Sequence, residues 1–374
     1  MYRPYLLLFL FCGLFLLPLQ AQKDKTNTIE KVITKHGQAF VRDKGINSVS
    51  IGIFKAGKRY SQHFGELEKG KGNTPTDETI YEIGSVTKTM TGYLVAKAVL
   101  EQKISLSDDV RRYLDGDFPN LVYNDKPITI QQLMTHTSGL PMFLPTTMNG
   151  LFEQGGENVP TTYFDLEKSY NKDQFFKDLK EVDLTYEPGT VYSYSNAGAE
   201  LIGHVLETVY QKDIDILLRE GFLDEYGMAN TAIKIDEIRK HNLTQGYWMN
   251  NTTPSPNQLN TLWATGGGAK MNMLDMLSYM ALQLNGKNPV VVESHRVLYE
   301  GEKLLRVGYF WRVWKDKYGT SYNHHGGTSG MQNWLFIFPK YDLGISIIAN
   351  QSGFKTPNKL SSTAKKLLKA IVKD

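Results

Sequence analysis

Apolar residues alternate with small or polar residues near both ends of this 374-residue chain, a pattern typical of half-buried β-strands. Residues 48–54 alternate in this way, a glycine-containing turn follows, and residues 59–64 continue as extended chain. Near the other end, residues 333–338 and 343–349 repeat the pattern around a proline-containing turn. Each pair of segments predicts a β-hairpin.

Apolar residues recur with a helical period just outside these hairpins and through most of the segment between them. Residues 24–43 and the lysine-rich residues 359–373 each place their apolar side chains on one face of a helix. The sequence therefore predicts an α+β fold, in which one antiparallel sheet is built from both chain ends and flanked by helices. A mostly helical lobe is inserted into it.

The two predicted lobes have approximate boundaries. The sheet lobe would comprise residues 24–80 and 300–374, and the helical lobe residues 85–300. Such an arrangement creates a cleft at the lobe boundary, where functional sites commonly lie. Residues 144–165 and 250–258 are predicted to be loops, and the first of them is expected to rim this cleft.

The N-terminus has the composition of a secretory signal peptide. Arg3 precedes an apolar run over residues 6–17, and Gln20-Ala21 offers a cleavage position. We expect residues 1–21 to be the signal peptide and residues 22–374 the mature domain, which would be secreted or periplasmic with no stable membrane span. An uncleaved N-terminal anchor is the alternative reading of the same run.

Charge and cysteine content exclude several classes of function. The formal net charge of +3 falls to +2 without Arg3, which is too small to indicate nucleic-acid binding. The only cysteine, Cys12, lies in the predicted signal peptide, so the mature chain has neither disulfides nor a cysteine nucleophile. The eight histidines form no zinc-type pair on a helix, and we expect no metal and no cofactor.

The first motif with chemistry is Ser85-Val86-Thr87-Lys88. Helical residues three apart are neighbours, so Ser85 and Lys88 can share one face of the apolar helix that follows. A desolvated lysine can take the proton of a serine and make it a nucleophile. The motif alone also fits a solvated helix turn or a capping serine, and a second match, Ser169 to Lys172, lies in a polar stretch.

The second motif is Tyr194-Ser195-Asn196, which follows a Pro-Gly turn and precedes a predicted helix. Tyr194 on its own could be a packed aromatic residue. Beside a lysine ammonium its phenolate form would be favoured, and it could then move a proton between Ser85 and a leaving group. Asn196 would hold the lysine or a substrate carbonyl.

The third motif lies in residues 323–330, directly before the last hairpin. It contains His324 and His325, followed by Gly326 and Gly327. Glycines that enter a strand allow a ligand or another backbone to approach closely, so the backbone N–H groups of Gly327 and Ser85 could form an oxyanion hole. A glycine-rich bend with surface histidines would have the same sequence.

Together, Ser85-x-x-Lys88, Tyr194-x-Asn196 and His324-x-Gly326 occur in the order of the serine β-lactamase and penicillin-binding protein superfamily. The chain resembles its branch of class C β-lactamases and related DD-peptidases and esterases over about residues 48–350. The resemblance implies a β-lactamase/DD-peptidase-like fold, with His136 in a structural role. His324 is the preferred first residue of the third motif, because Gly330 then keeps the family spacing; His325 is the alternative.

Carried over by this resemblance, Ser85 would be the acylated nucleophile, and Lys88 and Tyr194 would share proton transfer. Asn196, His324 and Gly326 would contact the substrate, and Ser85 and Gly327 would bind the oxyanion. Histidine in place of the lysine of class C enzymes gives less fixed positive charge for a substrate carboxylate, and it resembles DD-peptidases and esterases more.

The predicted function is that of a secreted serine hydrolase with an acyl-enzyme on Ser85. Its expected substrates are D-alanyl-D-alanine peptides of the cell wall, cleaved as a carboxypeptidase or endopeptidase. A β-lactamase or a small-ester esterase would keep the same mechanism with another acyl substrate. A catalytically silent penicillin-binding or sensor domain is the alternative from another class.

Overall fold

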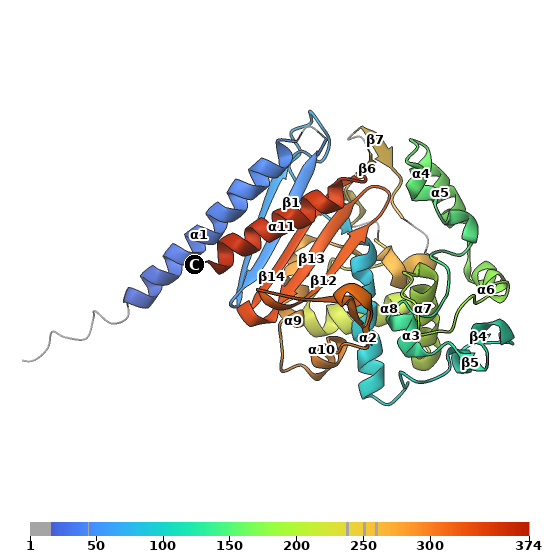
Figure 1. Ribbon diagram of the computed structural model, residues 1–374. Helices are drawn as coiled ribbons and strands as arrows, with labels where there is room; N and C mark the ends of the chain where they lie inside the picture. Colours follow the sequence, from blue (N-terminus) through green and yellow to red (C-terminus); the bar gives the residue numbers. More distant parts are fainter. Residues whose placement is uncertain (1–15, 44, 237–238, 250–251, 259–260, 374) are drawn as a thin grey trace, which may run out of the picture.

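The computed structural model describes residues 16–43, 45–236, 239–249, 252–258 and 261–373. Most of the predicted signal peptide therefore lies outside the described residues. A central eight-stranded antiparallel sheet dominates the fold (Figure 1). In spatial order its strands are β2 (Lys58–Gly65), β1 (Ser48–Lys55), β14 (Leu343–Ala349), β13 (Gln332–Phe338), β12 (Gly319–Gly327), β11 (Trp311–Asp316), β10 (Arg306–Gly308) and β9 (Tyr299–Glu300).

Both predicted hairpins are present, and they lie side by side near one edge of this sheet. The N-terminal strand β1 pairs with β14 near the C-terminus, so that Ile51 lies opposite Ile347. The predicted α+β fold, with one antiparallel sheet built from both chain ends and flanked by helices, is confirmed.

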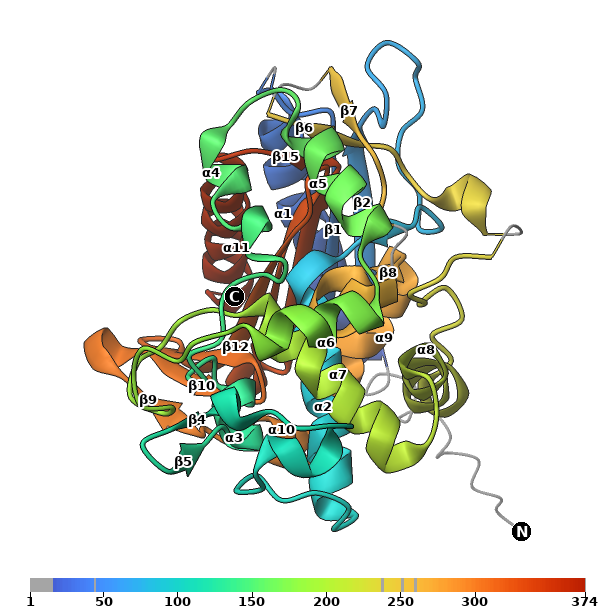
Figure 2. The ribbon, with the colours of Figure 1, turned by 90° about the vertical axis from the view of Figure 1, so that its right-hand side faces the viewer.

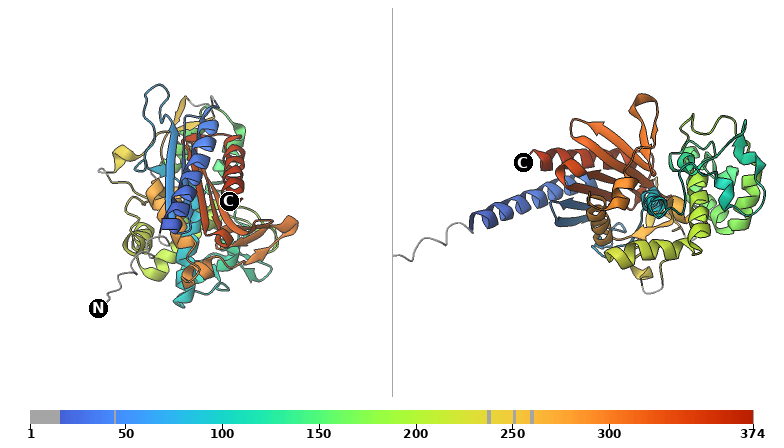
Figure 3. Two further views of the ribbon diagram at one scale, coloured as in Figure 1. Left: turned by 90° about the vertical axis from the view of Figure 1, so that its left-hand side faces the viewer. Right: turned by 90° about the horizontal axis from the view of Figure 1, so that it is seen from below.

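One face of the sheet is covered by two helices from the two ends of the chain, α1 (Leu16–Val41) and α11 (Thr356–Val372), which also pack on each other. Ile33 of α1 and Leu367 of α11 are fully buried in this layer. The first part of α1 projects past the edge of the sheet (Figure 3). Among the described helices, none combines the length and apolar character needed to cross a bilayer.

The opposite face packs on α9 (Met273–Gln283) and on the larger of the two apolar cores, which continues into the helical region (Figure 2). The remaining helices are α2 (Thr87–Leu100), α3 (Ile130–Met134), α4 (Leu151–Gln154), α5 (Val159–Ser169), α6 (Lys172–Lys180), α7 (Asn196–Tyr210), α8 (Ile214–Leu218) and α10 (Pro289–Ser294). The short strands are β3 (Tyr81–Glu82), β4 (Val122–Tyr123), β5 (Lys126–Pro127), β6 (Gly246–Trp248), β7 (Thr253–Ser255), β8 (Lys270–Met271) and β15 (Gln351–Ser352).

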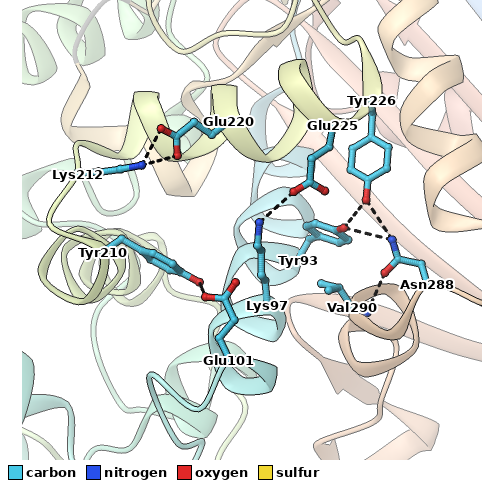
Figure 4. A network of polar contacts seen from close by, with 10 residues as sticks. All are labelled: Tyr93, Lys97, Glu101, Tyr210, Lys212, Glu220, Glu225, Tyr226, Asn288 and Val290. Atoms are coloured by element: carbon cyan, nitrogen blue, oxygen red, sulfur yellow. Dashed lines mark hydrogen bonds and ion pairs between the residues drawn. The ribbon is translucent and has the colours of Figure 1, made fainter.

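Helix α2 runs through the centre of this core, and its C-terminal half is fixed by polar contacts with neighbouring segments (Figure 4). The hydroxyl oxygens of Tyr93 and Tyr226 lie 2.8 Å apart, and Asn288 Nδ2 donates to the Tyr226 hydroxyl at 3.1 Å. Lys97 Nζ and Glu225 Oε1 are 3.0 Å apart. These contacts anchor one end of the helix whose other end follows Ser85.

The two predicted loops contain regular structure, so these predictions were wrong. Helix α4 and most of α5 fall within residues 144–165, and β7 falls within residues 250–258. In α5, Pro160 lies in the first helical turn. Proline is tolerated there because the first N–H groups of a helix have no partner within the helix.

Candidate active site

Ser85 lies in a short 3₁₀ turn, Gly84–Val86, that leads directly into α2. It is the only residue between positions 79 and 96 that is not buried. Gly84 has a φ of +50°, and a Cβ there would lie 2.6 Å from the Gly327 backbone nitrogen. Glycine is therefore required at position 84, because the turn needs a left-handed residue with no side chain against β12.

Lys88 lies one helical turn after Ser85, and its side chain is completely buried. Its Nζ is 3.2 Å from Ser85 Oγ and 2.6 Å from Asn196 Oδ1, and it also donates to the Gly266 carbonyl oxygen. The last two partners can only accept hydrogen bonds, whereas the serine hydroxyl can also donate. A neutral amine fits this arrangement, with two N–H donors satisfied and its lone pair directed at Ser85.

The electrostatic surroundings favour that neutral amine. Burial holds the pKa of the Lys88 ammonium well below its usual value, and the positive charge of Arg312 lowers it further. Glu200 acts in the opposite direction, but burial also raises the pKa of the Glu200 carboxyl well above its ordinary range. No ionised acid therefore compensates a proton on Lys88 at neutral pH.

Tyr194 lies beside the amine, with Lys88 Nζ 4.9 Å from the centre of its ring. Burial raises the pKa of the Tyr194 phenol, and a hydrogen-bonding interaction with Ser85 and the charge of Arg312 offset this only in part. The expected phenolate was therefore wrong, since Lys88 carries no charge that would stabilise it. In this structure Tyr194 is a neutral phenol, able to donate a proton.

The ring of Tyr194 is held in place by His136. The two ring centres are 4.3 Å apart, and His136 Nδ1 accepts a hydrogen bond from the Ser195 backbone N–H at 3.2 Å. His136 is buried, which keeps the pKa of its imidazole well below the usual value. This neutral ring supports the loop that carries Tyr194 and Asn196.

The two histidines of the third motif point to opposite faces of β12. The His324 ring centre lies 6.5 Å from that of Tyr194, and burial keeps the pKa of its imidazole well below the usual value. His325 lies instead 5.2 Å from the ring of Trp334, whose indole N–H donates to the Pro357 carbonyl in α11. The structure thus places His324 on the side of Ser85 and His325 on the far side.

The glycines after these histidines bring the end of β12 against the serine turn. A Cβ on Gly326 would lie 2.0 Å from the Ile83 carbonyl oxygen, and that oxygen accepts a hydrogen bond from Asn333 Nδ2 at 2.8 Å. Together with the contact between Gly84 and Gly327, this packing places the backbone of Gly327 next to Ser85.

A small cavity of about 60 Å³ opens beside Ser85. Asn196, Gly327 and Thr328 line it on the side of the predicted motifs. Its other wall is mainly aromatic and was not predicted: Phe143, Phe152, Tyr163, Gln258 and Trp263. The segment expected to rim the cleft thus contributes Phe152 from α4 and Tyr163 from α5.

Arg312 in β11 is a further residue that the sequence reasoning missed. Its positive charge helps to lower the pKa of Lys88 and of His324, and it opposes the rise that burial causes in the pKa of Tyr194. Among the described residues its guanidinium has no acidic partner, and it is only partly buried. The signal in the sequence was an arginine between the apolar residues Trp311 and Val313.

The second Ser-x-x-Lys match does not form a comparable pair. Ser169 is the last residue of α5 and donates to the carbonyls of Asp165 and Leu166, whereas Lys172 begins α6 and pairs with Glu207 at 3.0 Å. Over the described ranges, no group of three His, Cys, Asp or Glu side chains could hold a metal ion.

The sequence matches a family of known proteins. The family model "Beta-lactamase" matches residues 30–368, almost the whole chain. The chain belongs to the beta-lactamase family. Two curated relatives are each 25% identical to this chain. "Protein flp" of Staphylococcus aureus (strain N315) is 25% identical over 343 residues, which cover 89% of this chain and 65% of that protein. A "Beta-lactamase" of Providencia stuartii is 25% identical over 244 residues, or 65% of this chain and 57% of that protein.

Solved structures of this family share the fold at low identity. The "Beta-lactamase/D-alanine Carboxypeptidase" of Yersinia pestis superposes with a TM-score of 0.78 at 20% identity and covers 93% of this chain and 99% of its own. An octameric penicillin-binding protein homologue from Pyrococcus abyssi gives 0.73 at 20% identity, covering 92% and 77%. The family model indicates a serine hydrolase of the β-lactamase type, and the solved structures show that the chain shares their fold. The chain spans about two thirds of the length of the first curated relatives.

Proposed function

We propose that this protein is a secreted or periplasmic serine hydrolase that forms an acyl-enzyme on Ser85 and cleaves D-alanine-terminated cell-wall peptides. The observation that carries the proposal is the contact of Lys88 Nζ with Ser85 Oγ at 3.2 Å, in surroundings that keep the amine neutral. The buried amine is a base at neutral pH, and the partly exposed serine beside it is the nucleophile.

In the acylation step, Ser85 Oγ attacks the substrate carbonyl carbon while its proton passes to Lys88. The backbone N–H groups of Ser85 and Gly327 receive the negative charge that develops on the carbonyl oxygen. The neutral phenol of Tyr194 then supplies a proton to the departing amine and recovers one from Lys88. Asn196 holds Lys88 through its side-chain oxygen, at 2.6 Å.

In the deacylation step, a water molecule replaces the departed amine and attacks the ester carbonyl of Ser85. The same Lys88 and Tyr194 pair removes a proton from this water and returns one to Ser85 Oγ. The tetrahedral intermediate uses the same two backbone N–H groups. One cycle thus consumes one water molecule and leaves the enzyme unchanged.

The substrate class is supported by Arg312. A peptide that ends in D-alanine carries a carboxylate on its leaving group, and a partly buried guanidinium without an acidic partner can bind such a group with two parallel hydrogen bonds. Arg312 thereby supplies the positive charge that neutral His324 lacks. The Yersinia pestis neighbour is itself described as a D-alanine carboxypeptidase.

An esterase for small acyl esters is the second candidate. The small aromatic cavity beside Ser85 supports it, because its walls contain no charged side chain and leave little room for a long peptide. Such an enzyme would not need the charge of Arg312. A β-lactamase would keep the same acylation step.

The test is to incubate the protein with a D-Ala-D-Ala peptide, a β-lactam and a short-chain aryl ester, and to follow turnover and adduct mass. We expect peptide turnover and an acyl adduct on Ser85, absent from Ser85→Ala. Turnover of the ester alone would reject the peptidase activity. An adduct that persists at full strength in Ser85→Ala would reject the nucleophile.

Arg312→Met separates the two candidate substrates. A charge-assisted hydrogen bond contributes about 1.5–3 kcal/mol. The variant should therefore lose roughly 10- to 150-fold in kcat/KM on substrates with a free carboxylate. An uncharged aryl ester should be turned over at the wild-type rate. An equal loss on both substrates would show that Arg312 acts through the site itself.

A further inference from the structure

One layer of the molecule concentrates positive charge. Residues 28–41 of α1 and 356–373, which form α11 and its C-cap, contain seven lysines and one acid, a formal charge of +6. The whole chain has a formal charge of +3, so all other residues together carry −3. Such a separation creates a strong local potential although the net charge is small. The layer formed by these two helices is therefore a candidate surface for an anionic partner.

The helical period directs five of these lysines away from the sheet. Successive residues of an α-helix are about 100° apart, so Lys31 and Lys35 lie on the side of α1 opposite Ile33, which is fully buried. In α11, Leu367 and Ile371 are buried, and the lysines of its last turns fall on the other side. All five side chains are exposed, and together they form the surface that we call the lysine face: Lys31, Lys35, Lys366, Lys369 and Lys373.

The two helices contribute to one continuous lysine face. They cover the same side of the sheet and pack on each other (Figure 1). The pKa of His36 in α1 is lowered by burial and by the charges of Lys35 and Lys366, so one lysine from each helix lies close to the same imidazole. Among the described residues, no acid pairs with a lysine of this face, whereas Lys359, earlier in α11, pairs with Asp43 at 2.8 Å. The charge of the lysine face is therefore available to a partner.

We propose that the lysine face docks on a membrane surface that contains anionic phospholipids. Each lysine near such a surface attracts the phosphate head groups and strengthens binding by about fivefold. Several lysines on one face can therefore hold the protein at the bilayer without any apolar contact. The proposal does not depend on which acyl substrate the enzyme uses.

The chain that precedes the lysine face favours a bilayer over a nucleic acid. Helix α1 begins at Leu16, at the end of the apolar run over residues 6–17. An apolar segment and a basic surface together hold a protein stably at a membrane, whereas one such signal alone binds weakly and reversibly. A nucleic acid would use the lysines but gain nothing from the apolar run. Cleavage after Ala21 would remove the run and leave the lysine face as the weaker, reversible contact.

Docking by the lysine face leaves the active site free. On the side of the sheet that carries α11, His325 faces Trp334, whose indole N–H donates to the Pro357 carbonyl at 3.0 Å. Ser85 lies with His324 on the other side. The docked protein would therefore present Ser85 away from the bilayer.

The test measures sedimentation of the full chain with two kinds of vesicle, one of phosphatidylglycerol mixed with phosphatidylcholine and one of phosphatidylcholine alone. Both can take up the apolar run, but only the first offers anionic head groups. At low salt we expect at least about tenfold tighter binding to the anionic vesicles. The difference should shrink as salt rises, because salt screens the attraction. Equal binding to both vesicles at low salt would overturn the proposal.

A variant with four substitutions locates the surface: Lys31→Gln, Lys35→Gln, Lys366→Gln and Lys369→Gln. A matched control makes the same change in net charge at exposed lysines of the helical lobe: Lys168→Gln, Lys177→Gln, Lys234→Gln and Lys287→Gln. The first variant should lose at least about tenfold on anionic vesicles and keep its binding to phosphatidylcholine, while the control stays within about twofold of wild type. An equal loss in both would show that net charge, and not the lysine face, attracts the membrane.

Competition with duplex DNA separates a bilayer from any other polyanion. Anionic vesicles should retain the wild-type chain in the presence of an equal phosphate concentration of DNA, because only the bilayer also accepts the apolar run. Complete displacement by DNA would assign the lysine face to a nucleic acid and overturn the proposal. Acylation of Ser85 at the wild-type rate shows that the variants are folded. If either variant does not fold, the lipid and salt dependence of the wild-type chain decides.

Discussion

Lys88 and Lys270 are two buried lysines that serve the fold in different ways. Both are at most 3% exposed, and burial lowers the pKa of both. Lys88 donates to the Gly266 carbonyl and Lys270 to the Gly268 carbonyl. Lys270, however, lies near the acids Glu82 and Glu167, whose charges raise its pKa again. The direct partners of Lys88 are a hydroxyl, an amide and a carbonyl.

This difference shows why burial alone does not make a catalytic base. Lys270 donates to two backbone carbonyls, Ile233 O at 3.0 Å and Gly268 O at 3.1 Å, rather than to a hydroxyl. Lys88 combines a lowered pKa with a hydroxyl whose proton it can accept. We therefore expect the same substitution at the two positions to affect different properties of the protein.

The largest effect is expected for Lys88→Met. Loss of the general base should lower the rate of Ser85 acylation by about 10²–10⁴-fold, while methionine keeps much of the buried volume. Lys88→Arg should be similarly slow, because a guanidinium keeps its proton at any pH that proteins tolerate. Acylation is measured by mass spectrometry against time. Substantial activity in Lys88→Arg would mean that position 88 supplies charge rather than a base.

The pH dependence follows from the lowered pKa of Lys88. The rate should be constant over neutral pH and fall about tenfold per pH unit once pH drops below the pKa of the folded protein, as the amine becomes protonated. An unperturbed lysine would place this fall near pH 10.

The stability of the fold changes with pH in the same direction as the rate. Between the lowered pKa and the ordinary one the unfolded chain binds more protons, so stability rises with pH, and Lys88→Met should flatten that slope.

A control for the pH dependence of the rate uses Lys270→Met, in which Lys88 is retained. The acid limb of its rate profile should stay at the wild-type pH. If the acid limb shifted in Lys270→Met but stayed in place in a slow, measurable Lys88 variant, the titrating group would be Lys270 and not Lys88.

Much of this site was predictable because its residues lie where elements begin or end. Ser85 precedes α2, Asn196 begins α7 and Gly327 ends β12. Such positions carry turn and capping signals that a sequence shows directly. The fold was predictable for a similar reason, since the hairpins at both ends alternate cleanly and only an antiparallel sheet accommodates them.

The remaining features depend on contacts between distant segments. Arg312 reaches the site because β11 pairs with β12, where it lies opposite Asn323. Gln258 and Trp263 lie in a segment whose apolar residues follow neither a helical nor a strand period. The direction of their side chains could therefore not be inferred from the sequence. Tyr194 stays protonated because distant segments bury it, among them the one that carries the ring of His136. The residues next to Tyr194 in the sequence do not indicate this burial.

Lys270→Met should change stability more than activity. The carbonyls of Ile233 and Gly268 would lose their donor, and leaving such buried groups unpaired costs about 1–3 kcal/mol each. The variant should unfold at lower temperature or denaturant concentration, with kcat/KM near the wild-type value. A loss of activity as large as that of Lys88→Met, at unchanged stability, would remove the distinction between the two lysines.

The smallest effect is expected for Lys97→Met, which makes the same chemical change on the exposed side of α2. Lys97 Nζ pairs with Glu225 Oε1 at 3.0 Å in the network of Figure 4, and both side chains are partly exposed. Exposed ion pairs contribute at most about 1 kcal/mol, because water and salt screen them. Denaturant unfolding should show a loss of that size or less, reduced further at high salt, with an unchanged acylation rate. A large loss of activity in Lys97→Met would show that a Lys→Met change in α2 can lower activity by disturbing the helix. The effect of Lys88→Met could then have the same cause, and the assignment of Lys88 as the base would depend on Lys88→Arg alone.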